Sequence, residues 1–428
     1  MFRSRLLAGA AGILLLAGCS FDLGLGGSDE PQALVVGGES YATKVGASIL
    51  AQGGRAADAA AAMYFALAVT DPADAGLGGG GVCLVYDPEK SASEEFVFLP
   101  KAASAGGFAV PANVAGFAAL HEAYGVLPWA KIVTPAESYA RTGFPVSHAL
   151  APRLAAAADA IRLDAALAHE FMDESGKVKR AGATTVDPAL AATLSGLRSD
   201  GPEAFYSGKT AGAIAAYTAT QGAGVTAAEL KAVKVLRGAP HATRVGGNYV
   251  FLPSEKSGAG RHLRSLVDAL SRARGKDGTP AAPAAEPAGD LGATGFAVTD
   301  AKGQSVACAV TMNGLFGAGR TVPGTGITLA RAAGPAADYL SPVISSPDAD
   351  GQAVLVGAGG GPRSARALAE ALSRIADDKK LVAYKDVQHD SSVSDNANLI
   401  VCAGGLCTPL ADAAAGALGL SVPMPGKK

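Results

Sequence analysis

The sequence predicts an α+β fold in which β-sheets are covered by layers of helices. Helical patterns dominate residues 43–235, whereas the apolar runs after residue 290 are short and strand-like. The chain has 428 residues, of which 49% are hydrophobic and 17% are charged, so it is long and apolar enough for one large core or two smaller ones. Its net charge of −2 and its lack of any basic run give no support to nucleic-acid binding.

The N-terminus predicts secretion and the attachment of lipid. Two arginines precede the short apolar run 6–17, and the sequence Leu16-Ala17-Gly18-Cys19 then resembles a bacterial lipobox. The alternative is an ordinary signal peptide that happens to be followed by a cysteine. We interpret residues 1–18 as a lipoprotein signal peptide and Cys19 as the lipid-bearing first residue of the mature chain.

The residues that follow indicate where the protein resides. Ser20, rather than an aspartate, stands after the cysteine, which favours the outer membrane. Residues 19–32 are rich in Gly and Ser and have no apolar period, so they predict a flexible tether. We therefore expect a bacterial cell-envelope protein that is lipid-anchored in the outer membrane and faces the periplasm.

The first part of the chain alternates long helical patterns with a few short strands. Apolar spacing predicts helices over residues 43–52, 56–69, 111–124, 128–142, 187–197 and 225–235. The last of these begins with Thr226 and has Glu229 three residues later, which is the pattern of a capping box. Strands are predicted over residues 82–86, 96–99 and 248–252. The glycine run 76–81 indicates that backbones pack closely where it enters the first strand.

A linker and a strand-rich part complete the chain. A short helix is expected around residues 261–274, and residues 274–290 are rich in Pro and Ala without any period, which predicts a linker. The predicted elements beyond it are strands over 295–299, 305–311, 353–356 and 399–402, a helix over 364–377 and a small helix over 410–418.

The cysteines suggest one disulfide and no metal site. Cys402 and Cys407 flank a Gly-Gly turn signal, so a small loop-closing disulfide is expected there in an oxidising compartment. Cys83 and Cys308 lie within strand-like runs, and we interpret both as buried small hydrophobes. The spacing of Cys and His residues fits no zinc motif, and no metal or cofactor is predicted.

Three long segments, in the same order, resemble the γ-glutamyltranspeptidase family. They are residues 42–87, residues 111–146, and residues 292–363, which include the sequences GATGFAVTD and VGAGGGPR. The resemblance implies an N-terminal-nucleophile hydrolase fold, an αββα four-layer sandwich. It divides the chain into a large-subunit-like region, 33–273, and a small-subunit-like region, 291–428, on either side of the linker.

The resemblance also locates the nucleophile of the family. Family members cut their own chain before a threonine, whose hydroxyl then attacks the γ-glutamyl amide while its new α-amine acts as the base. Phe296, Val298 and Asp300 match the family pattern that follows this threonine, and they place Ala293 at its position. Thr294 is the alternative nucleophile, but a shift of one residue in a strand turns a side chain to the opposite face.

Four further positions match the pocket of the family in part. Thr311 corresponds to the threonine that supports the nucleophile, and Asn313 to the asparagine that contacts the glutamyl group. Gly360 and Gly361 correspond to the pair that stabilises the oxyanion, although a tight strand-to-helix turn would equally require glycines. Lys101 falls near the arginine that binds the substrate carboxylate, although it also fits a solvated surface lysine.

Other family features are missing, and they change the predicted function. Arg331 and its neighbours stand where the family has asparagines and acidic residues, and Asp338-Tyr339 replaces a serine pair. The sequence therefore predicts an uncut, catalytically impaired lipoprotein that retains binding of a small γ-glutamyl molecule. The alternatives are an active γ-glutamyl hydrolase or transferase that uses Thr294, and a structural envelope protein. No protein partner follows from the sequence.

Overall fold

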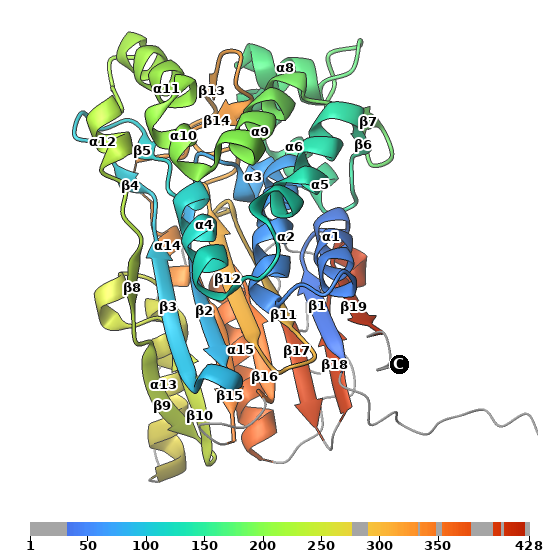
Figure 1. Cartoon of the computed structure of the whole chain (residues 1–428), viewed down its shortest axis with the longest axis vertical. Coiled ribbons are helices and arrows are strands. Elements are labelled where there is room, and N and C mark those ends of the chain that lie inside the picture. The colour runs from blue at the N-terminus through green and yellow to red at the C-terminus, as the bar shows by residue number, and fades with distance from the viewer. Residues whose placement is uncertain are drawn as a thin grey trace, which may run out of the picture. The chain divides into compact units, whose positions relative to one another are not determined.

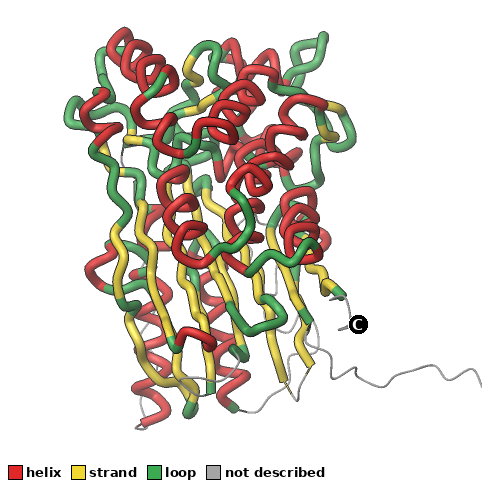
Figure 2. The backbone as a smooth tube through the Cα atoms, viewed as in Figure 1, coloured by secondary structure: helices red, strands yellow, loops and turns green. Residues whose placement is uncertain are grey.

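Two antiparallel β-sheets lie face to face between layers of helices in the computed structural model (Figures 1 and 2). The structure describes residues 32–275, 290–332, 334–347, 353–377, 397–403 and 406–423. The predicted signal peptide, the lipid-bearing Cys19, nearly all of the tether and most of the 274–290 linker lie outside these described residues.

The first sheet has seven strands in the order β19-β1-β11-β12-β2-β3-β8. Their bounds are β1 Ala33–Gly37, β2 Gly80–Asp87, β3 Ala92–Phe98, β8 Leu236–Gly238, β11 Ala293–Thr299, β12 Ser305–Thr311 and β19 Leu418–Val422. The second sheet has six strands in the order β18-β17-β16-β15-β10-β9. Their bounds are β9 His241–Val245, β10 Asn248–Leu252, β15 Val343–Ser346, β16 Leu355–Ala358, β17 Asn398–Ala403 and β18 Leu406–Leu410. Each sheet therefore combines strands from before and after the predicted linker.

Helices cover the outer face of each sheet. The first sheet is covered by α1 Ser40–Ala51, α2 Ala56–Thr70, α4 Asn113–Tyr124 and α5 Trp129–Thr142, and the second by α13 Arg261–Gly275 and α15 Pro362–Ala376 (Figure 1). Every residue of α2 is buried, and its many alanines allow neighbouring elements to approach it on all sides. Among the described residues, none of the helices combines the length and apolar character that a membrane span needs.

Shorter elements gather at one end of the sandwich, at the top of Figure 1. The helices there are α3 Pro72–Ala75, α6 Leu150–Ala156, α7 Ala158–Arg162, α8 Ala165–Phe171, α9 Pro188–Asp200, α10 Pro202–Ser207, α11 Lys209–Thr220 and α12 Ala227–Lys231, whereas α14 Ala336–Tyr339 lies lower in Figure 1. Two-stranded sheets are formed by β4 Lys101–Ala102 with β5 Ala109–Val110, β6 Phe144–Pro145 with β7 Thr184–Thr185, and β13 Thr321–Val322 with β14 Ile327–Thr328.

Most of the helices and strands predicted from apolar spacing are present, with shifted ends. The capping box of α12 is confirmed, because the Thr226 hydroxyl accepts the Glu229 N–H and the Glu229 carboxylate accepts the Thr226 N–H. The predicted small helix over 410–418 is wrong. Strand β18 ends at Leu410, a single 3-10 turn covers Ala413–Ala415, and β19 then pairs with β1 at the edge of the first sheet. The pairing of Leu418–Val422 with β1 is a long-range contact, which the local pattern does not show.

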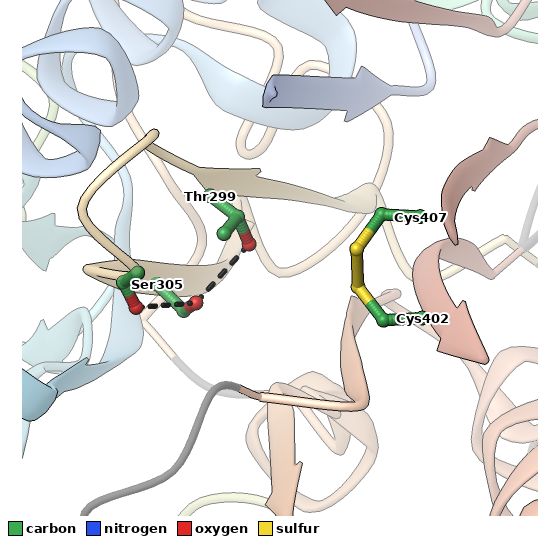
Figure 3. The surroundings of a disulfide bond; sticks show 5 residues. Thr299, Ser305, Cys402 and Cys407 are labelled. Carbon is green, nitrogen blue, oxygen red and sulfur yellow. Dashed lines mark hydrogen bonds between the residues drawn. A yellow bond between two sulfur atoms is a disulfide. The ribbon is translucent and has the colours of Figure 1, made fainter. Parts of the chain in front are cut away.

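Both pairs of cysteines form disulfides. Cys402 and Cys407, for which a loop-closing disulfide was predicted, are bonded between β17 and β18, near the Thr299 and Ser305 hydroxyls of the first sheet (Figure 3). The interpretation of Cys83 as an unbonded hydrophobe is wrong, because it is bonded to Cys308. These two residues are opposite each other on β2 and β12, with Cα atoms 4.1 Å apart, which is the close spacing that a cross-strand disulfide needs.

The Cys83–Cys308 disulfide joins the two subunit-like regions across the predicted linker. We expect that a protease site inserted within residues 276–289 and then cut will yield two fragments on a denaturing gel only after reduction. The matched control is the Cys83→Ala/Cys308→Ala variant, whose fragments should separate without reductant. Separation of the unmodified chain's fragments before reduction would contradict the bond.

Candidate functional site

Ala293 begins β11 and faces the second sheet. It is 4% exposed and lies opposite Thr311 of β12. A Cβ atom placed on Gly360 would lie only 2.5 Å from the Ala293 Cβ, so these two residues are in direct contact. The structure thus brings together three of the positions that the family resemblance singled out.

The Thr311 hydroxyl holds the peptide group that precedes Ala293. Its Oγ1 donates to the Gly292 carbonyl at 2.8 Å, and the Met312 N–H donates to the same oxygen at 2.8 Å. Gly292 has φ +54°, and a Cβ atom there would lie 2.1 Å from the Gly314 carbonyl, so only glycine fits. The carbonyl of the Gly292–Ala293 bond is therefore fixed and polarised by two donors.

Thr294 faces away from this arrangement. The side chains of Phe296 and Val298 pack with the helices, whereas Ala293 and Ala297 belong to clusters between the sheets. Because successive side chains of a strand alternate between faces, Thr294 shares the helix-facing side with Phe296. Its Oγ1 lies 3.1 Å from the place that a Cβ of Gly38 would take. The β11–β12 pairing is continuous from Ala293 to Thr299, without a bulge that would turn Thr294 around.

Gly360 and Gly361 connect β16 to α15 beside Ala293. Gly361 is the N-cap residue of α15 and provides no side-chain cap. Gly360 has to be a glycine for packing alone, since any side chain would strike Ala293. The requirement for glycine at position 360 is therefore met without any catalytic role.

The region that would receive a substrate amine is occupied by contacts within the chain. Asn313 adopts φ +57°, and its side-chain amide donates to the Arg331 carbonyl at 2.9 Å. The Arg331 side chain is exposed, and its Nε donates to the Gly317 carbonyl at 2.7 Å. Asp338 pairs with Arg261 of α13 at 3.2 Å. The Arg331 guanidinium therefore lies beside Gly314, and the Asp338 carboxylate is already paired.

Lys101 is exposed on β4 and lines a cavity that the other predicted site residues do not share. The lining of this cavity includes none of Ala293, Thr311, Asn313 or Gly360. The structure therefore brings Thr311, Gly360 and Ala293 together but does not place Lys101 in the same cavity.

A buried group of carboxylates lies behind the segment that leads into β11. Asp71 and Asp74 flank the Arg153 guanidinium, whose Nε lies 2.5 Å from Asp74 and 3.8 Å from Asp71. Both aspartates are at most 1% exposed. Asp290 adds its charge to this group and accepts the Gly292 N–H at 2.8 Å. Sequence reasoning missed the group, for which the only local signal was two aspartates in an otherwise apolar stretch.

Burial and crowding of like charges shift the protonation of this group. Burial raises the pKa of Asp71 to about 6 against the opposing attraction of Arg153, and burial also raises the pKa of Asp74 well above its usual value. Burial lowers the pKa of Arg153, but the surrounding carboxylates outweigh that effect and raise it. The aspartates therefore hold protons in a pH range where exposed aspartates do not.

Within the described residues, no group of three or more His, Cys, Asp or Glu side chains is arranged to hold a metal ion.

Solved structures show which fold this arrangement belongs to. The chain is similar to the cephalosporin acylase of Bacillus halodurans, with a TM-score of 0.70, 18% identity, and coverage of 92% of this chain and 94% of that one. It is also similar to the γ-glutamyltranspeptidase of Helicobacter pylori, with a TM-score of 0.51, 26% identity, and coverage of 55% and 73%. The fold is thus the αββα sandwich of the N-terminal-nucleophile hydrolases, as the resemblance implied.

Sequence comparison then identifies the family. The family model described as gamma-glutamyltranspeptidase matches residues 42–273, which is more than half of the 428 residues, and the chain belongs to this family. A glutathione hydrolase of Aspergillus flavus is 36% identical over 228 residues, which are 49% of this chain and 39% of that protein. The glutathione hydrolase proenzyme of Escherichia coli is 30% identical over 263 residues, which are 56% and 45%. The chain spans less than half the length of these two relatives.

The buried aspartates predict how stability depends on pH. Because the folded-state pKa of Asp71 lies above the unfolded value of about 4, its stabilising contribution is complete in acid and is lost as the pH rises through about 6. As the pH rises from acid to neutral, the free energy of unfolding of the Asp71→Asn variant should fall by less than that of the unmodified chain. The difference between the two changes should be on the order of 2 kcal/mol. Urea unfolding over a pH series measures this difference.

The matched control for this series is Asp159→Asn, because Asp159 is exposed on α7 and pairs only with Arg162 in the structure. Its pH dependence should follow that of the unmodified chain. Equal slopes for Asp71→Asn and the unmodified chain would show that Asp71 does not retain its proton.

Proposed function

We propose that the protein is a non-catalytic member of the γ-glutamyltranspeptidase family that remains uncut between Gly292 and Ala293. One observation carries the proposal: the residue that faces Thr311 and Gly360 has a methyl group where the chemistry needs a hydroxyl. A methyl group has no lone pair with which to attack an amide, so it supports neither self-cleavage nor acyl transfer.

The surroundings of Ala293 support this proposal. The Thr294 hydroxyl is on the opposite face of β11, and no bulge in the β11–β12 pairing re-aims it. The Arg331 guanidinium, which lies beside Gly314, would repel a substrate ammonium, and the Asp338 carboxylate is paired with Arg261. Binding of a γ-glutamyl molecule, the ligand class suggested by relatives named glutathione hydrolases, would therefore be weak and without turnover.

The proposal includes a location in the cell envelope. Cys19 and the sequence before it fit lipid attachment, and a chain anchored in this way would face the periplasm. The disulfides Cys83–Cys308 and Cys402–Cys407 support an oxidising compartment, where such bonds persist.

A reducing, denaturing gel of the purified chain tests the uncut state. We expect one band at full length, and reduction is essential because Cys83–Cys308 would hold two fragments together. Two bands at the sizes expected for a cut near residue 293 would overturn the proposal. So would release of product from a chromogenic γ-glutamyl amide that Thr294→Ala abolishes, because that result would identify Thr294 as an active nucleophile.

Restoring the hydroxyl tests the cause directly. We expect Ala293→Thr to cut itself into two fragments, because the Gly292 carbonyl is already bound by Thr311 and Met312. Ala293→Val has the same shape without the oxygen and should stay intact, as should the Ala293→Thr/Thr311→Ala variant. Ala293→Ser adds only one non-hydrogen atom, and it supplies a hydroxyl for the same test if the threonine side chain is too large for the space beside Gly360. If both hydroxyl variants fold and stay whole, a missing hydroxyl is not what stopped the reaction.

A further inference from the structure

The cavity lined by Lys101, which does not include Ala293 in its lining, has the features of a small-molecule site. It opens between β3 with its β4–β5 extension and the segment from α12 to β8, and its volume is about 390 Å³. This volume lies in the lower part of the range of about 300–1,000 Å³ that ligand sites occupy. At roughly 30 Å³ per displaced water, it accommodates a molecule of about ten non-hydrogen atoms.

The floor of the cavity is apolar. Val97, Phe98 and Val110 line it and are at most 8% exposed. Leu236, which also lines it, is 51% exposed, so apolar surface continues to the rim. A ligand with an apolar body would remove this surface from water, which stabilises the complex by about 25 cal/mol for each Å² of apolar surface buried.

The lining of the cavity has two lysines and one carboxylate, so its net charge is +1. Lys101 and Lys234 both line it and are exposed, and within the described part of the chain neither ammonium group has an ion-pair partner. The carboxylate in the lining, Glu229, accepts the N–H and hydroxyl of Ser104 and of Thr226 at 2.7–2.8 Å. These hydrogen bonds lower the pKa of Glu229 to about 2, so it stays ionised and offsets one of the two lysine charges, and one positive charge remains for a ligand.

We propose that this cavity binds a small amphipathic carboxylate, with the apolar body against Val97, Phe98 and Val110 and the carboxylate group between Lys101 and Lys234. The proposal is independent of whether the chain cuts itself at Ala293. It also differs from binding of a γ-glutamyl group, which would bring an ammonium ion towards two lysines and a polar chain onto an apolar floor.

Calorimetric titration with octanoate tests the proposal, with octanamide as the uncharged ligand of the same size. The full chain is used with Cys19→Ser, which removes the proposed lipid attachment. We expect octanoate to bind about tenfold more tightly than octanamide, because two exposed charge pairs contribute about 1–2 kcal/mol. Lys101→Gln/Lys234→Gln should abolish this preference, and added salt should weaken it.

Two further variants separate the cavity from the rest of the surface. Ala232→Phe introduces a ring into the cavity from an exposed position and should block octanoate without lowering the thermal stability. Lys231→Gln, in the lining of a different cavity, is the matched control and should bind octanoate normally. No binding of octanoate, equal binding of octanamide, or a preference for octanoate that survives the double lysine variant would each overturn the proposal. Glutathione binding that needs the same lysines and displaces octanoate would also overturn it.

Discussion

The close approach of the two sheets at β11 determines the geometry of the site. A Cβ atom on Gly295 would lie 2.4 Å from the Gly359 N atom, and one on Gly360 would meet Ala293 at 2.5 Å. Neither position tolerates a side chain, so the start of β11 is fixed against the turn that leads into α15. The placement of residue 293, the orientation of Thr311 and the register with β12 all depend on this contact. Packing between the sheets therefore accounts for the glycines at positions 295 and 360.

The same end of the sandwich contains buried charge that contributes little to stability. Taking carboxylates out of water is unfavourable, and Arg153 compensates for only part of the charge of Asp71 and Asp74. The Arg153 guanidinium nevertheless attracts both Asp74 of α3 and Asp290, which accepts the Gly292 N–H in the segment before β11. We interpret this group of charges as a device that fixes the position of this segment at the expense of stability, while the apolar clusters around α2 and between the sheets stabilise the fold.

Local patterns predicted the elements well, and long-range pairing explains where they failed. The helices α2 and α15 and the capping box of α12 follow from apolar spacing and capping residues within one segment. The family register that placed Ala293 at the nucleophile position came from Phe296, Val298 and Asp300, which lie in β11 or directly after it. The Cys83–Cys308 bond, in contrast, depends on β2 and β12 being neighbours in the sheet. The sequence of neither segment alone predicts this pairing. Strand β19 was missed for the same reason, because only its pairing with β1 makes it a strand.

The candidate site shows the same division between local and long-range information. Thr311 and Gly360 were named from the family resemblance, and the structure brings both to Ala293. Lys101 was grouped with them, although it lines another cavity. The carboxylates around Arg153 could not be predicted, because residues far apart in the sequence form the group only after the helices have packed.

The Cys83–Cys308 bond also has a topological consequence. It closes a loop of 225 residues, which in the chain-entropy view disfavours the unfolded ensemble by roughly 5 kcal/mol. At one edge of the first sheet, Ala33 of β1 is paired with Val422 of β19, so the first and last strands of the described sequence are neighbours. The halves on either side of residues 276–289 are therefore connected by a covalent bond and by shared sheets, and the peptide backbone between them is a redundant connection. A circular permutation opened within that stretch would leave both of these connections in place.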